Sequence, residues 1–365
     1  MAGGAPISFA RGAPSLDIID VDGLRAAADR AFANDPGGAF SYGTAIGYVP
    51  LREWIAEHHD VDPANVLVTN GSMQADAFLF ETLVHAGDAV VTERPTYDRT
   101  LLSLRGRGAD VHMVELEEDG IDVDALARDL GGGLTPKLAH IIPNFQNPAG
   151  YTLSEVKRRR LVELAAEHGF LIFEDDPYVA LRFAGDPLPR MLELDPERVI
   201  YASSFSKTVC PGIRVGYLVG PVALIEQIRV LATNTYISPS MVAEAIVNEV
   251  FRSVALARSI ETVRAALGER ARTLAEALQR ELPEARFHPP GGGYFMWVEL
   301  PEGTDVAALF GAAKERGVAF VKGTDFVLEG GENTLRLAYS GVTPAEIEDG
   351  VSRLADAYRT VGVAA

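Results

Sequence analysis

The sequence predicts an α/β protein with two domains, the larger built on a mainly parallel seven-stranded sheet and the smaller of α+β type. The first observation is alternation, because short apolar runs and helical segments take turns between about residues 60 and 220. The second is length, since 365 residues can bury a large core and are enough for two domains. The third is a change of pattern after residue 220, where long alanine- and leucine-rich helices precede a strand of alternating character.

Seven short apolar runs predict the strands of the larger domain. Helices are expected in most of the gaps between them, and such alternation places helices on both faces of the sheet. Ser154 suits the N-cap of the last of these helices, and Gly169 can end it in a left-handed conformation. The predicted strands are 66–69, 89–92, 111–114, 138–142, 170–174, 198–202 and 215–219, and the predicted helices are about 73–84, 97–107, 122–130 and 154–168.

The two ends of the chain complete the prediction. An extended arm over residues 1–20 leads to a helix at about 22–34, and a glycine-punctuated loop at 42–52 enters a further helix. Three units follow: 1–40 as arm and first helix, packing with the small domain; 41–255 as the large domain; and 256–365 as the small domain. Within the last unit we expect a strand at 294–300, a helix near 304–316, strands near 318–321 and 334–339, and a closing helix at 343–359.

The composition of the chain limits the classes of partner and site that we expect. A formal net charge of −18 argues against nucleic acid and anionic membranes as partners, since both attract clustered positive charge. The basic cluster 157–160 lies in a predicted amphipathic helix, which favours a solvated face. Cys210 is the only cysteine, no apolar run approaches the roughly 20 residues of a membrane span, and the histidines lack helical ligand spacing. We therefore expect a cytoplasmic protein without a metal site. Cys210 could be a thiol near a functional site or serve core packing, and packing is the favoured interpretation.

Polar residues gather directly after four of the predicted strands. In a parallel sheet these positions converge on one rim, where open α/β sheets bind ligands. The free N–H groups of a helix that begins at Gly71-Ser72-Met73 would suit a phosphate, although a generic glycine turn explains the same residues. The clusters are 70–74, 143–150, 174–178 and 203–214.

Lys207 is informative because lysine is rare in this chain. Five of the 33 basic residues are lysine and the other 28 are arginine. Arginine cannot form a Schiff base, whereas a partly buried lysine can, so a lysine in a loop between two apolar strands indicates imine chemistry. A solvated surface lysine is the alternative reading.

Four motifs together resemble the class I/II aminotransferases, which have fold type I and use pyridoxal 5′-phosphate (PLP). Asn-Pro-x-Gly, Asp-x-x-Tyr, Ser-x-x-Lys and a late arginine occur in that family's order. Residues 47–52 and 175–178 also resemble the subgroup that contains 2-aminoadipate and kynurenine aminotransferases, although Met73 stands where that subgroup often has glutamine. The motifs lie at 147–150, 175–178 and 204–207, with Arg336 in the segment 335–340.

The resemblance implies roles for individual residues. Lys207 would form the Schiff base and move the substrate proton, with Asp175 and Tyr178 as its catalytic partners. Asp175 would pair with the pyridine nitrogen, whereas a helix cap or surface acid is the alternative. Asn147 would contact the ring oxygen, whereas a turn residue is the alternative. The further implied contacts are Tyr178 with the ring oxygen; Tyr97 with the ring face; Gly71, Ser72, Met73, Ser204, Ser206 and Arg214 with the phosphate; Arg336, Asn147 and Gly12 with the substrate; and Tyr42 with the phosphate of the neighbouring subunit in a homodimer.

These roles predict an aminotransferase that moves the amino group of an L-amino acid to a 2-oxo acid, 2-oxoglutarate or pyruvate, by a ping-pong mechanism. A lyase, decarboxylase or oxidase could use the same scaffold, although a carboxylate clamped by Arg336 argues against decarboxylation. A PLP- or amino-acid-sensing domain of a transcription regulator is the non-enzymatic alternative, and the acidity of the chain counts against DNA binding. Arg11 could meet an acidic or polar substrate side chain, but a surface position is the expectation.

Overall fold

The computed structural model describes residues 5–253 and 255–361, and its centre is a sheet of eight strands. Pairing is parallel from β8 through β7, β6 and β3 to β4, whereas β9 runs antiparallel to both of its neighbours. The order is β2 (Val66–Thr69), β9 (Gly216–Val219), β8 (Val199–Ser204), β7 (Leu171–Asp175), β6 (Leu138–Ile141), β3 (Ala89–Arg94), β4 (Asp110–Glu117) and β5 (Gly120–Ile121).

All seven predicted strands form, and β5 is an eighth that the sequence analysis missed. It has two residues and turns back antiparallel on the end of β4, so it is too short to produce an apolar run. Gly120 has φ +110°, a left-handed conformation that suits glycine in so tight a return. The mainly parallel α/β architecture is confirmed.

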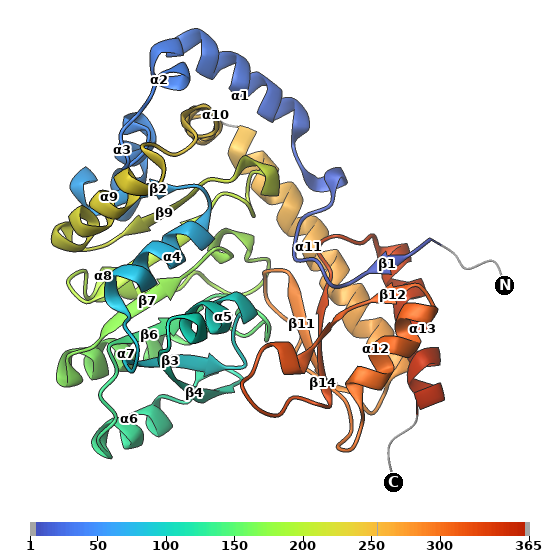
Figure 1. Cartoon of the computed structure of the whole chain (residues 1–365). Coiled ribbons are helices and arrows are strands. Elements are labelled where there is room, and N and C mark those ends of the chain that lie inside the picture. The colour runs from blue at the N-terminus through green and yellow to red at the C-terminus, as the bar shows by residue number, and fades with distance from the viewer. Residues whose placement is uncertain (1–4, 254, 362–365) are drawn as a thin grey trace.

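Helices cover both faces of this sheet, which explains why its strands read as continuous apolar runs (Figure 1). Val68 and Ile172 point into one buried cluster, whereas their neighbours Leu67 and Phe173 point into the other. The cluster with Leu67 includes side chains of α4 (Ser72–Leu83), α5 (Asp98–Gly106) and α9 (Val222–Tyr236); the cluster with Val68 includes side chains of α3 (Val49–His59), α6 (Val123–Gly131), α7 (Glu155–His168), α8 (Met191–Leu194) and α10 (Met241–Phe251).

A second body, orange to red in Figure 1, has a core of its own. A four-stranded antiparallel sheet packs with three helices around buried residues such as Leu274, Met296 and Leu337. We propose the domain boundary between α10 and α11, near residue 255, because the buried clusters divide there. The elements are β10 (Arg286–Phe287), β11 (Phe295–Glu299), β14 (Thr334–Ala338) and β13 (Val321–Lys322), with α11 (Ala255–Glu281), α12 (Val306–Glu315) and α13 (Pro344–Val361).

The amino-terminal segment contacts both bodies. β1 (Ile7–Ser8) pairs in parallel with β12 (Val318–Ala319) of the second body. α1 (Val21–Asn34) instead packs on α10, and α2 (Pro36–Phe40) lies beside both helices. The expectation that the first helix packs with the small domain is therefore wrong for α1, although the arm before it does lie there. An apolar stripe shows that a helix needs a partner but does not say which one.

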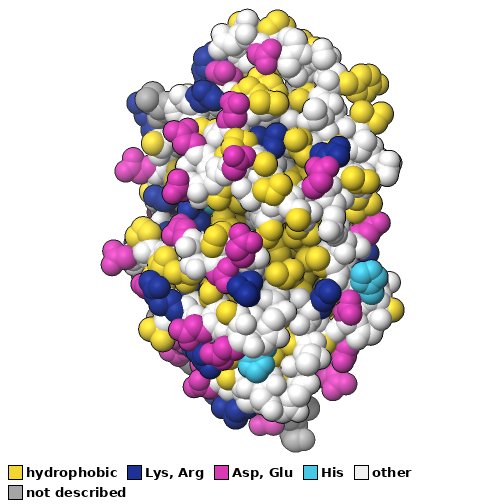
Figure 2. Space-filling view, turned by 90° about the vertical axis from the view of Figure 1, so that its left-hand side faces the viewer, with side chains coloured by type: hydrophobic (Ala, Val, Ile, Leu, Met, Phe, Trp, Pro, Cys, Tyr) yellow, Lys and Arg dark blue, Asp and Glu magenta, His cyan; other side chains and the backbone are white. Residues whose placement is uncertain are grey.

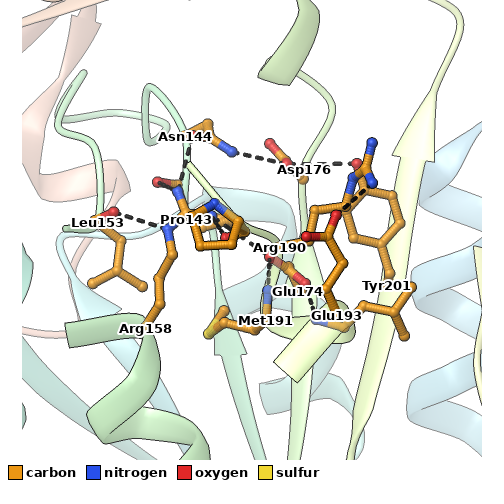
Figure 3. Close-up of polar contacts among 12 residues, drawn as sticks. Pro143, Asn144, Leu153, Arg158, Glu174, Asp176, Arg190, Met191, Glu193 and Tyr201 are labelled. Carbon is orange, nitrogen blue, oxygen red and sulfur yellow. Dashed lines mark hydrogen bonds and ion pairs between the residues drawn. The ribbon is translucent and has the colours of Figure 1, made fainter. Parts of the chain in front are cut away.

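The basic cluster on α7 corrects another expectation. Arg158 is fully buried and Lys157 nearly so, whereas Arg159 and Arg160 contact solvent. Arg158 donates to the carbonyl oxygens of Leu153 (2.9 Å) and Pro143 (3.0 Å), so it fixes the loop that follows β6 (Figure 3). The basic cluster was expected to be a solvated face, but one of its members, Arg158, is a buried structural residue. Its buried charge is tolerated because its N–H groups donate hydrogen bonds.

Charged side chains are dispersed over the face of the molecule that Figure 2 shows. Acidic, basic and hydrophobic side chains mix on the face in Figure 2, and hydrophobic side chains gather near its middle. In residues 5–253 and 255–361, none of the helices combines the length and apolar character that a membrane crossing requires.

Candidate active site

A cavity of about 140 Å³ opens where β6, β7 and β8 end, at the rim that the strand pattern predicts. Asp76, Ile142 and Pro177 also line this central cavity, and none of these three was predicted as a site residue. Ten predicted residues line it: Ser72, Met73, Tyr97, Asn147, Asp175, Tyr178, Ser204, Ser206, Lys207 and Arg214.

The start of α4 forms one end of the central cavity. Gly71 is the N-cap residue, and no side chain caps the helix, so the N–H groups of Ser72 and Met73 point outward from a helix N-terminus. A Cβ atom at Gly71 would lie 2.3 Å from Nη2 of Arg214, and its φ of +85° also favours glycine. Arg214 donates to Oγ of Ser206 at 3.4 Å. Backbone donors, hydroxyls and a guanidinium at one point fit the phosphate of PLP.

Lys207 lines the same cavity, and its amine is held by the amino-terminal arm. Nζ donates to the carbonyl oxygen of Gly12 at 2.9 Å, and the ring of Tyr294 lies 5.3 Å from it. Burial, followed by the positive charges of Arg336 and Arg214, lowers the pKa of Lys207 to about 8. This amine is therefore far easier to deprotonate than an exposed lysine.

Asp175 is the last residue of β7, and one oxygen of its carboxylate accepts no hydrogen bond from the described residues. Its Oδ1 is buried without a hydrogen-bond partner among the described residues, and its Oδ2 lies 3.5 Å from Nε2 of His140. Buried polar atoms are normally paired, so an orphan facing a cavity indicates a ligand with a donor. The protonated pyridine nitrogen of PLP is such a donor, and the site fits the cofactor here as well.

Two tyrosines and an asparagine complete the walls. Burial raises the pKa of Tyr97 to about 12 and that of Tyr178 well above its usual value, so both phenols stay protonated at neutral pH. Oδ1 of Asn147 accepts from Nη1 of Arg336 at 2.8 Å. Gly150 has φ +77° in the turn that presents Asn147. A Cβ atom at this position would lie 2.8 Å from the carbonyl oxygen of Phe295, so a larger residue would force the backbone to shift.

Arg336 comes from β14 of the second body and is held between aromatic rings beside the central cavity. Its guanidinium carbon lies 4.3 Å from the ring centre of Phe295 and 4.9 Å from that of Phe326. Nη2 donates to the carbonyl oxygen of Ala10 at 2.8 Å, so the arm touches both Arg336 and Lys207. A fixed, planar guanidinium is suited to bidentate binding of a carboxylate.

Asp76 is the main residue that the sequence analysis missed. It lies one turn into α4, is buried, and lines the same cavity as Asp175. Burial and then the charge of Asp175 hold the pKa of Asp76 well above its usual range. The sequence does contain a signal for Asp76. It is four residues after Ser72, and this spacing places both side chains on the same face of the helix.

Tyr42 is not brought to the central cavity of its own chain. It is 88% exposed and lines a separate cavity of about 310 Å³ with Phe40 and Met241. Arg11 is exposed, as expected, yet its charge contributes to lowering the pKa of Lys207. Cys210 packs against the core cluster that contains α7, which confirms the expectation of a packing role.

Comparisons with known proteins place the chain in a family. It belongs to the class I and II aminotransferases, because the model of that family matches residues 6–354. It is 35% identical to a 2-aminoadipate transaminase from Thermus thermophilus over 97% of this chain and 90% of that protein. It is 31% identical to aromatic-amino-acid aminotransferase 1 from Thermococcus litoralis, over 96% and 87% of the two chains.

A solved structure gives the same result. The alpha-aminoadipate aminotransferase LysN from Thermus thermophilus, complexed with N-(5′-phosphopyridoxyl)-L-leucine, superimposes with a TM-score of 0.93 and 34% identity, covering 98% of this chain and 92% of that one. The predictions of fold type I, of PLP as cofactor and of an aminotransferase are confirmed. The chain is a PLP-dependent transaminase whose substrates are amino acids and 2-oxo acids.

Proposed function

We propose that the central cavity transfers the amino group of an L-amino acid, of 2-aminoadipate-like or aromatic type, to 2-oxoglutarate or pyruvate. One observation carries this proposal: Lys207, with its lowered pKa, lines the same cavity as Asp175, whose Oδ1 has no hydrogen-bond partner among the described residues. The donor range follows the relatives named above, and the buried rings of Tyr178 and Phe295 near Lys207 and Arg336 are compatible with it.

The cavity offers complementary groups to each part of PLP, which supplies an aldehyde and an electron-accepting ring. The start of α4, with Ser204, Ser206 and Arg214, would hold the phosphate. Asp175 would accept a hydrogen bond from the ring nitrogen and keep it protonated, because a buried carboxylate favours a positive charge beside it. Tyr97 would lie against the ring, while Asn147 and Tyr178 would hold the ring oxygen.

Lys207 would hold the cofactor and, once released by the incoming amine, carry the proton of the substrate. Proton transfer requires a neutral amine, and burial beside two guanidinium groups lowers the pKa of Lys207 to about 8, so the neutral amine forms at a much lower pH than in an exposed lysine. Nζ donates to the carbonyl oxygen of Gly12 and lies near the rings of Tyr178 and Tyr294. These contacts keep the amine of Lys207 in place at the wall of the cavity.

Arg336 would bind the α-carboxylate of the substrate. Its hydrogen bonds to Asn147 and to the backbone of Ala10 fix the plane of the guanidinium before the substrate arrives. Gly12 lies in the same arm, and a Cβ there would meet the ring of Phe295 at 2.5 Å, so a side chain at this position would force that ring or the arm to shift.

The proposal is tested by a matrix of amino donors against 2-oxoglutarate, pyruvate and no acceptor. We expect a 2-oxo acid from the donor only when an acceptor is present, with 2-aminoadipate, kynurenine or aromatic amino acids among the best donors. Product formation that continues without an acceptor would contradict transamination and indicate elimination or oxidation.

The lowered pKa of Lys207 predicts an unusual pH dependence of cofactor binding. With a pKa of about 8, the amine of the cofactor-free protein is mostly neutral above pH 8, whereas an ordinary lysine, with a pKa of 10.5, is still charged there. The rate of reaction with PLP should rise about fivefold between pH 7 and 8 and level off by about pH 9. Absorbance of the bound cofactor measures it. The control is Nα-acetyllysine, whose rate should keep rising to about pH 10, and a parallel rise in the protein would contradict the assigned pKa.

We further propose a homodimer in which Tyr42 reaches the phosphate of the partner's cofactor. Exposed apolar side chains around the 310 Å³ cavity, including Phe40, Ile237 and Val242, support a contact there. Light scattering during gel filtration should give twice the mass of the chain, and Tyr42→Ala should speed dissociation of the cofactor. A fully active monomer would contradict shared sites, and an unchanged dissociation rate in Tyr42→Ala would contradict the contact with the phosphate.

A further inference from the structure

A second cavity lies outside the catalytic machinery and is lined by positive charge. Its volume is about 490 Å³, and its lining residues come from the segment 179–190, from α3 through His58 and from α11 through Arg264. Three of them are arginines (Arg182, Arg190 and Arg264), and none of the lining residues described is acidic. In a chain with a net charge of −18, such a concentration of cations requires an explanation.

Two of these arginines have unused hydrogen-bond donors. Nε of Arg264 donates to the carbonyl oxygen of Ala180 at 2.7 Å, and Nη2 of Arg182 donates to Oδ1 of Asn144 at 3.0 Å. Among the described residues, neither arginine has a carboxylate within 4.0 Å, whereas most other arginines of the chain are paired. Their remaining guanidinium N–H groups are therefore available to a ligand.

The third arginine is only partly neutralised. Nη1 of Arg190 contacts Glu193 at 2.7 Å and Nη2 lies 2.9 Å from Nε2 of His58, but its Nε is buried without a partner among the described residues. The pKa of Arg182 is lowered first by burial and then by the charge of Arg158, with a smaller contribution from Arg264. Asp176 and Asp186 offset this only in part. Mutual repulsion among cations is relieved when an anion binds between them.

The rest of the wall is apolar and includes Val179, Phe183 and Leu188. Guanidinium forks match carboxylates in bidentate geometry, and an apolar wall favours a hydrocarbon spacer between charged groups. We propose that this cavity is an accessory site for a small dianion, and that it takes a dicarboxylate with a short aliphatic chain in preference to inorganic phosphate.

The site has a short connection to the catalytic centre. Nη2 of Arg182 donates to Oδ1 of Asn144. Nδ2 of Asn144 in turn donates to Oδ2 of Asp176 at 2.8 Å (Figure 3). Asn144 belongs to the loop that presents Asn147, and Asp176 follows Asp175 directly. A ligand on Arg182 would therefore be linked through two hydrogen bonds to Asp176, the neighbour of Asp175 in the chain.

Calorimetric titration of the holoenzyme with glutarate at fixed ionic strength tests the proposal. The titrations use an Arg336→Gln background, which removes the guanidinium that could bind glutarate at the central cavity. We expect one glutarate per chain, an affinity at least about tenfold weaker after Arg264→Gln, and weaker binding of phosphate than of glutarate. Arg272→Gln is the matched control, because Arg272 is an exposed arginine on the same helix, and it should leave the affinity unchanged.

Equal affinity in the Arg264→Gln and Arg272→Gln proteins would overturn the site, because the attraction would then be a property of the whole surface. Phosphate that binds as tightly as glutarate would overturn the preference for a dicarboxylate. If the Arg336→Gln protein fails to fold, the series keeps Arg336, and the expected result is that Arg264→Gln removes one of two binding events.

Discussion

Lys207→Arg should abolish transamination while leaving the fold unchanged. Arginine keeps the positive charge, but it stays protonated at neutral pH, so it can neither bond to the cofactor aldehyde nor accept a proton. We expect kcat to fall by at least about 10³-fold, within the range for loss of a positioned acid–base group. Turnover with the best donor of the matrix measures the loss, and absorbance after dialysis shows whether PLP is still held covalently.

Lys137→Arg is the matched control, because Lys137 is an exposed lysine that does not line the central cavity. Its kcat should equal that of the parent within about twofold. Substantial turnover by the Lys207→Arg protein would refute the catalytic role, whereas equal losses in both variants would indicate that arginine at either position damages the fold.

Asp175→Asn should lower both cofactor affinity and kcat. The carboxylate is expected to pair with the ring nitrogen in a buried place, and truncating one partner of such a pair costs about 2–5 kcal/mol. This corresponds to a loss of roughly 30- to 4,000-fold. Equilibrium titration with PLP measures the affinity, and turnover with the best donor of the matrix measures kcat.

The cofactor-free protein provides the control for Asp175→Asn. Oδ1 of Asp175 has no partner among the described residues, and the amide oxygen of asparagine can still face Nε2 of His140, so this replacement should not lower the melting temperature of the cofactor-free protein. Stabilisation by added PLP should shrink, because it follows the affinity for the native state. A lower melting temperature without PLP, combined with unchanged PLP affinity, would assign Asp175 a structural role instead.

The sheet and the rim could be predicted because their signals are local. Each strand at the centre of the sheet has apolar residues on both faces, as Phe173 and Ile172 show, so it appears in the sequence as a short uninterrupted run. Parallel pairing then brings the polar residues that follow the strands to one rim without further information. Ten predicted residues do line one cavity.

What could not be predicted depends on tertiary partners. Arg158 is indistinguishable in sequence from its neighbours Arg159 and Arg160, and only the carbonyl groups of the loop after β6 make its burial favourable. Asp76 has no motif around it, because its significance comes from Asp175, which is 99 residues away in sequence. The packing of α1 on α10 likewise joins segments that are far apart in the chain.

The arm over residues 10–12 has a consequence for how this protein can diverge. It touches Arg336 and Lys207 through the carbonyl oxygens of Ala10 and Gly12, which every amino acid possesses. Substitutions at position 10 can therefore accumulate without changing those two contacts, and alanine scanning will not detect them. Only replacements that alter the main chain itself, such as proline or an ester linkage, can reveal what these carbonyl groups contribute.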